Sequence, residues 1–75
     1  MTQAELLRKR IYIKAMRRGE DISFFDVVEI ASSYKRPASV SIEEIIDMCV
    51  DAYQSCGFCP PEADELKELD LALYF

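Results

Sequence analysis

The three cysteines are the side chains best suited to chemistry, and two of them form a C-x-x-C motif, Cys56-Gly57-Phe58-Cys59. In thiol–disulfide oxidoreductases this spacing holds a thiolate of low pKa at the N-terminus of a helix. Here Gly57 predicts the end of a helix, and the helix dipole at a C-terminus raises the pKa of a thiol. The strands of a thioredoxin-like fold are also missing, so the motif does not indicate redox catalysis.

Zinc binding is the second chemistry that the cysteines suggest. Cys49, Cys56 and Cys59 provide three thiolates, but the chain has no histidine to complete the site. The fourth ligand would have to be a carboxylate, which is unusual in structural zinc sites. An odd number of cysteines does not suit a disulfide framework either. We expect three free thiols, no bound metal and no cofactor.

The other reactive groups form no catalytic constellation. The absence of histidine excludes His-dependent triads and imidazole acid–base catalysis. A helical domain of 75 residues also offers little concave volume for a substrate. We therefore predict no catalytic residues and no enzymatic activity.

The composition predicts a small acidic protein of the cytoplasm. Fourteen acids and nine bases give a net charge of −5, and half of the residues are apolar. The first residues lack the basic-then-apolar order of a signal peptide, and no apolar run approaches the roughly 20 residues of a membrane span. One domain, residues 1–75, accounts for this length, and its core is small enough that a second copy or a partner could complete it.

The charge is distributed unevenly along the chain. Residues 1–18 contain one acid and six bases, namely Arg8, Lys9, Arg10, Lys14, Arg17 and Arg18, whereas residues 19–75 contain thirteen acids and three bases. The bases can pair with acids of the same chain or lie solvated beside them. They can also contact a nucleic-acid backbone, an acidic protein or an anionic membrane surface.

Residues 3–18 are predicted to form a helix with two apolar faces. Helical periodicity places Ala4, Leu7, Ile11 and Ala15 on one stripe. Leu6, Ile13 and Met16 fall on a different side of the helix, with Tyr12 between the two sides. Such a helix is either deeply embedded or has one face for the core and one for a partner, and complete embedding is hard to arrange in so short a domain.

A second helix is predicted over residues 24–35. Ser23 and Asp26 resemble a capping box, and Ile22 and Val27 stand at the positions of a hydrophobic staple. The apolar stripe of this helix consists of Phe24, Val27, Val28, Ala31 and Tyr34, flanked by Ile30. Phe25 lies off the stripe, where it is either exposed or packed against the edge of the first helix.

The third helix, predicted over residues 42–56, has the clearest start signal. Ser41 and Glu44 form the sequence of a full capping box, with Val40 and Ile45 as the staple. The apolar stripe is centred on Ile42, Ile46, Cys49 and Tyr53, flanked by Ile45, Val50 and Ala52. Gly57 then ends the helix in a left-handed conformation, with Phe58 folded back over the last turn.

The opposite face of this helix is an acidic ridge of Glu43, Glu44, Asp47 and Asp51. Such a ridge is either solvated or docks on a basic partner. A helix-turn-helix made from the second and third helices is disfavoured, because four carboxylates on the reading helix would repel DNA phosphates.

A shorter fourth helix is predicted over residues 62–73, with Leu66, Leu69 and Leu73 on one stripe. The chain then ends in Tyr74 and Phe75, two aromatic residues that we expect to dock on the core or at an interface.

These observations predict an all-α fold of three main helices and a short fourth, with antiparallel neighbours. We predict a non-enzymatic regulator or inhibitor that binds another protein, or itself, through the first helix, the acidic ridge and the C-terminal aromatic residues. The residues expected at this interface are Leu6, Arg10, Ile13, Met16, Arg17, Glu43, Glu44, Asp47, Asp51, Tyr74 and Phe75. The alternative is a nucleic-acid-binding accessory factor that uses the basic first helix.

Overall fold

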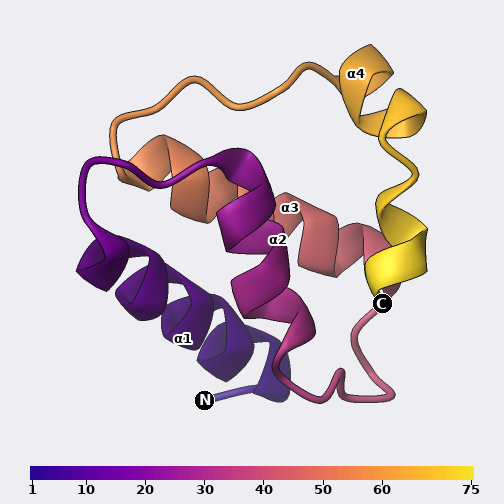
Figure 1. The fold of residues 1–75 in the computed structure, drawn as a ribbon. Coiled ribbons are helices and arrows are strands. Elements are labelled where there is room, and N and C mark those ends of the chain that lie inside the picture. The colour runs from indigo at the N-terminus through magenta and orange to yellow at the C-terminus, as the bar shows by residue number, and fades with distance from the viewer.

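The computed structural model describes residues 1–75 and is entirely helical (Figure 1). Three main helices are α1 (Gln3–Arg18), α2 (Phe24–Ser32) and α3 (Ile42–Ser55). A short helix, α4 (Ala63–Glu68), and a single 3₁₀ turn, η1 (Leu71–Tyr74), follow them. The predicted all-α class is therefore confirmed.

Each of the three main helices packs against the other two. The short connections turn the chain back at α2, so that α1 and α3 run in the same general direction (Figure 1). The start of α1 lies next to the loop before α3, where the Ser39 hydroxyl lies 3.1 Å from the Gln3 side-chain oxygen. Helix α2 crosses both of them obliquely in Figure 1, so the predicted antiparallel packing does not describe the α1–α3 pair.

The helix starts are held by side chains that satisfy free backbone N–H groups. Thr2 of α1 and Ser23 of α2 each form a full capping box, with Glu5 and Asp26 respectively. Ser41 accepts a hydrogen bond from the Glu44 N–H at 3.1 Å, but the Glu44 carboxylate does not bond back to the Ser41 N–H. The prediction of a full capping box for α3 is therefore wrong, because only one of its two hydrogen bonds is present.

The core is formed by one face of each helix, as the periodicity predicts for α1 and α2. From α1 it takes Leu7, Ile11 and Ala15, and from α2 it takes Phe24, Val27, Val28, Ile30 and Ala31. Ile22 and Val40 are buried just before α2 and α3, where the two hydrophobic staples place them. No buried side-chain nitrogen or oxygen lacks a hydrogen-bond partner.

The buried face of α3 is rotated from the predicted stripe. Its fully buried residues are Ile45, Met48, Cys49 and Ala52, while Ile42, Ile46, Val50 and Tyr53 are only half-buried. The predicted centre omitted Met48, because an adjoining apolar arc of Ile42, Ile46, Val50 and Tyr53 dominates the periodicity. That other arc is covered in part by residues that follow α3.

The end of α3 has the predicted left-handed glycine. Gly57 has φ of +93°, its N–H bonds to the Gln54 carbonyl, and the Phe58 N–H bonds to the Tyr53 carbonyl, which is a Schellman motif. The Phe58 ring stacks on Tyr53 with centroids 5.2 Å apart, and Tyr53 meets Phe24 of α2 edge-on at 5.6 Å. Through this aromatic cluster the C-terminus of α3 packs against α2.

Helix α2 ends three residues earlier than predicted. The hydroxyls of Ser32 and Ser33 bond back to the carbonyls of Glu29 and Ile30, at 2.9 and 2.6 Å. Serine side chains that bond to the backbone in this way compete with continued helix. Helix α2 therefore ends at Ser32, before Pro37, whose ring disfavours a helical conformation at Arg36.

The predicted fourth helix is interrupted. Helix α4 ends at Glu68, Asp70 adopts a left-handed conformation with φ of +47°, and η1 then packs against α2. Leu66 and Leu69 pack on the core, but Leu73 is 82 % exposed and Leu71 is buried in its place at 2 % exposure. The single stripe of Leu66, Leu69 and Leu73 is therefore wrong beyond Leu69.

None of the helices combines the length and the apolar content needed to cross a membrane.

Candidate interaction face on helix α1

Three of the six bases of α1 are engaged within the chain. Arg8 forms an ion pair with Asp51 of α3, and Arg18 lies 3.5 Å from a carboxylate oxygen of Asp26 of α2. The Lys14 ammonium lies 5.2 Å from the centre of the Tyr34 ring, which is a cation–π distance. These bases attach α1 to its neighbours, as the intramolecular interpretation predicts.

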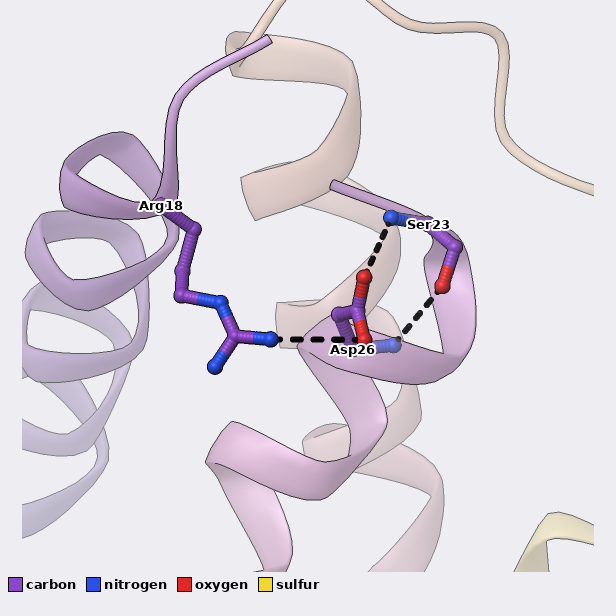
Figure 2. A network of polar contacts seen from close by, with 3 residues as sticks. All are labelled: Arg18, Ser23 and Asp26. Atoms are coloured by element: carbon purple, nitrogen blue, oxygen red, sulfur yellow. Dashed lines mark hydrogen bonds and ion pairs between the residues drawn. The ribbon is translucent and has the colours of Figure 1, made fainter. Parts of the chain in front are cut away.

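Figure 2 shows how Arg18 reaches the start of α2. The Ser23 N–H donates to Asp26 at 2.8 Å, and the Asp26 N–H donates to the Ser23 hydroxyl at 3.2 Å. These hydrogen bonds, with a smaller contribution from the Arg18 charge, lower the pKa of Asp26 below its usual value. The Asp26 carboxylate thus caps the start of α2 and also pairs with Arg18. Because of this pairing, Arg18 contacts α2 and has a structural role.

The other three bases, Lys9, Arg10 and Arg17, form no ion pair or side-chain hydrogen bond. Helical spacing places them on the exposed side of α1, where Lys9 also borders a hollow shared with α3 and Arg17 borders a hollow shared with α2. On the same side, Leu6 and Ile13 are each 39 % exposed and Met16 is 55 % exposed. We call these six residues (Leu6, Lys9, Arg10, Ile13, Met16 and Arg17) the outward face of α1.

The outward face has the spacing of a helix–helix seam. Leu6 and Ile13 are seven residues apart and Met16 is three residues further on, so the three side chains follow one line along the helix. Arg10 and Arg17 run beside that line, each four residues after Leu6 or Ile13. The opposite side of α1 is the core face, so α1 presents two seams on opposite sides.

The acidic ridge of α3 is exposed, as predicted, but its members differ. Asp51 is engaged by Arg8, whereas Glu43, Glu44 and Asp47 form no ion pair. No large apolar side chain of α3 is exposed among them. The ridge therefore offers charge without apolar contact area, unlike the outward face of α1.

The C-terminal aromatic residues are only partly available. Phe75 is half-buried against the core, while Tyr74 and Leu73 are exposed. The expected docking on the core is thus confirmed for Phe75, whereas Tyr74 is exposed and its contact with a partner stays a prediction.

A hollow of about 660 Å³ lies between α1 and α3. Lys9 and Tyr12 line it from α1, and Met48, Asp51 and Ala52 line it from α3. Its charged groups are of both signs, and the Arg8–Asp51 ion pair lies in its wall. It contains no arrangement of nucleophile, base and oxyanion donors that would define a catalytic centre.

The cysteines do not converge on a metal site. Cys49 is buried, Cys56 is half-buried at the end of α3, and Cys59 is exposed. No group of three or more potential ligands is gathered anywhere in the chain. Burial raises the pKa of the Cys49 thiol to about 12, so this thiol is unreactive in the folded protein.

This raised pKa predicts a pH dependence of stability. The folded chain keeps the Cys49 proton until about pH 12, whereas the unfolded chain releases it above pH 9.0. Stability is therefore complete below pH 9 and falls as the pH rises towards 12, by about 1 kcal/mol at about pH 10. Urea unfolding at about pH 8 and about pH 10 measures the loss. Between these two pH values the Cys49→Ala variant should lose about 1 kcal/mol less stability than the unchanged chain. An equal loss of stability in both proteins would contradict the assignment to Cys49.

No protein-family model, curated protein or solved structure matches the chain. The residues of α1 that were predicted at an interface, Leu6, Arg10, Ile13, Met16 and Arg17, are all exposed, and their contact with a partner stays a prediction. Sequence reasoning did not single out Lys9, although helical spacing from Leu6 and Ile13 indicates that position.

Proposed function

We propose that this chain is a non-enzymatic protein-interaction module of the cytoplasm that regulates or inhibits another protein by binding it through the outward face of α1. The observation that carries the proposal is the exposed line of Leu6, Ile13 and Met16, bordered by bases without partners. Apolar side chains in water on a helix already anchored by its other face are typical of a binding seam. Three free thiols support a reducing compartment.

The acidic ridge and the exposed Tyr74 have secondary roles in this proposal. Glu43, Glu44 and Asp47 lie on α3 and can steer a partner with basic groups at its edge. Charged groups at the rim of an interface change the association rate more than the affinity. Most of the affinity is therefore expected to come from α1.

Site-specific photo-crosslinking in the cells that express the protein tests the proposal. A crosslinking amino acid at position 13 should give one discrete adduct, whereas the same amino acid at position 25 or 73 should not. Phe25 and Leu73 are matched controls, because they are apolar and exposed at 44 % and 82 % but lie outside α1.

The crosslinked protein is then identified, purified and titrated with variants. Ile13→Asp should weaken its binding at least about tenfold, since it places an unpaired charge in an apolar seam. Phe25→Asp should leave the affinity within about twofold, a difference of under 0.5 kcal/mol. Equal effects of the two variants, or adducts from all three positions, would remove the support for α1 as the binding face.

A nucleic-acid-binding accessory factor is the second candidate, and it is favoured by the three unpaired bases of α1. Because Arg8, Arg18 and Lys14 are engaged within the chain, no more than about three phosphate contacts come from the outward face. Such binding would weaken with salt at a log–log slope of about −2.7 on duplex DNA. Fluorescence titration of labelled duplex and single strands at low salt separates the candidates, since the protein-interaction proposal expects no binding at micromolar protein.

A further inference from the structure

We infer that the partner segment is an acidic amphipathic helix that lies along α1, with apolar residues on Leu6, Ile13 and Met16 and carboxylates opposite Arg10 and Arg17. This inference rests on the proposed function and specifies the chemistry of the partner.

The shape of the outward face suits one helix. Its apolar residues span eleven positions of α1, from Leu6 to Met16, which corresponds to about 15 Å of helix. Residues spaced seven and three apart form a seam into which the side chains of a second, nearly aligned helix interdigitate. About three turns of a partner helix therefore cover the whole face.

The charge of the face selects carboxylates. Arg10 and Arg17 stand on the same edge of the seam, one turn beyond Leu6 and Ile13, and neither has a partner in the chain. Lys9 lies on the other side of the line from Leu6 to Ile13. A helix with acidic residues flanking its apolar stripe would pair with these three bases, and a basic helix would be repelled.

A second copy of this chain does not satisfy the same face. Two α1 helices packed antiparallel on this seam, with Leu6 of one copy opposite Met16 of the other, would bring the two Arg10 side chains to within about two positions of each other on the same edge, a like-charge pair. The acidic ridge of a second copy would provide charge but no exposed apolar side chain. The acidic helix α4 has its apolar residues, Leu66 and Leu69, already packed on its own core.

An extended anionic surface is disfavoured for a different reason. A membrane or a nucleic acid is wider than one helix, so it would also face groups beside α1. The chain has a net charge of −5, and Glu43, Glu44 and Asp47 of α3 are unpaired. A chain of net negative charge is repelled by phosphates or anionic lipids over a wide contact, whereas a single helix contacts only α1 and its bases.

The test uses three fluorescent helical peptides of about 18 residues, long enough to be helical in water. All three have leucines at the same seam positions, and the flanking positions are Glu, Gln or Lys. Binding is measured by anisotropy on the full chain at about 0.05 and about 0.3 M salt. We expect the Glu peptide to bind at least about tenfold tighter than the Lys peptide, with a smaller difference at the higher salt.

Charge reversal on the protein provides the decisive comparison. The variant with Arg10→Glu and Arg17→Glu should reverse the preference and bind the Lys peptide tighter than the Glu peptide. The control variant, Lys35→Glu with Lys67→Glu, changes the net charge equally at exposed bases outside α1 and should keep the original preference. If the reversed variant lost its helical circular dichroism, Arg10→Gln with Arg17→Gln should abolish the preference instead.

Each other outcome has a definite meaning. Equal binding of the three peptides, with loss of all binding in Ile13→Asp, would overturn the acidic partner while leaving the face as a protein-binding site. No binding of any peptide, or tight binding to phosphatidylserine vesicles in place of the Glu peptide, would also overturn the inference. The proposed function fails separately, when the partner crosslinked in cells binds Ile13→Asp as tightly as the unchanged chain.

Discussion

Ile11→Ala is expected to lower the free energy of unfolding by about 2–5 kcal/mol, and Ile13→Ala by less than about 1 kcal/mol. The two isoleucines are two positions apart on α1, but Ile11 is fully buried in the core and Ile13 is 39 % exposed. Truncating Ile11 leaves a cavity among close-packed side chains, whereas the site of Ile13 fills with water. A domain of this size is typically stable by about 4–11 kcal/mol, so Ile11→Ala removes a large share of its stability.

Urea unfolding followed by circular dichroism measures both variants under the same conditions. Alanine has the higher helix propensity, so any small effect of Ile13→Ala includes a stabilising contribution of a few tenths of a kcal/mol. Equal losses in the two variants would show that both faces of α1 are buried. In that case the outward face would not exist as a free surface.

Leu71→Ala is the second substitution with a large expected effect, also about 2–5 kcal/mol. Leu71 is 2 % exposed in η1, which packs on α2, whereas Leu73 is 82 % exposed. Leu73→Ala should therefore change the stability by less than about 0.5 kcal/mol. This pair of variants tests the interruption at Asp70 directly.

A continuous helix over residues 62–73 predicts the reverse order. In that helix Leu73 shares the stripe of Leu66 and Leu69 and would be buried, while Leu71 would face outward. Thermal unfolding of both variants distinguishes the two arrangements, because 1 kcal/mol shifts the Tm of a domain of this size by about 4–8 °C. A larger loss for Leu73→Ala would contradict the arrangement of the C-terminal segment described above.

The sequence was sufficient to predict the core face of α1 and the ends of several helices, because these features depend on residues close together in the chain. Periodicity placed Leu7, Ile11 and Ala15 in the core, and Ser23, Ser41 and Gly57 marked helix ends through bonds to nearby backbone groups. These features act within a turn or two of helix, so no knowledge of the distant chain is needed.

The interruption at Asp70 could not be predicted in this way. Local spacing favours a continuous helix, and a left-handed aspartate is uncommon. The chain adopts it where the following residues, Leu71 and Phe75, pack on the core. Tertiary packing outweighs helix propensity at such a position, because propensity differences are below about 1 kcal/mol per residue.

The candidate site shows the same division. The exposure of Leu6, Ile13 and Met16 followed from the two-faced pattern of the first helix. The pattern could not show which bases remain free, because Arg8 and Arg18 pair with carboxylates that lie far along the chain or on another helix. Only the packing of α1 against α2 and α3 distinguishes these bases from Arg10 and Arg17.

The central claim is that the outward face of α1 binds an acidic helix, and amide chemical shifts test it most directly. Titration of the ¹⁵N-labelled chain with the Glu peptide should shift the amide signals of residues 6–17 of α1. The signals of Phe25 on α2 and of α4 should remain in place. Shifts centred on α3 or α4, or none at peptide concentrations up to about 1 mM, where even a weak complex forms, would contradict the claim.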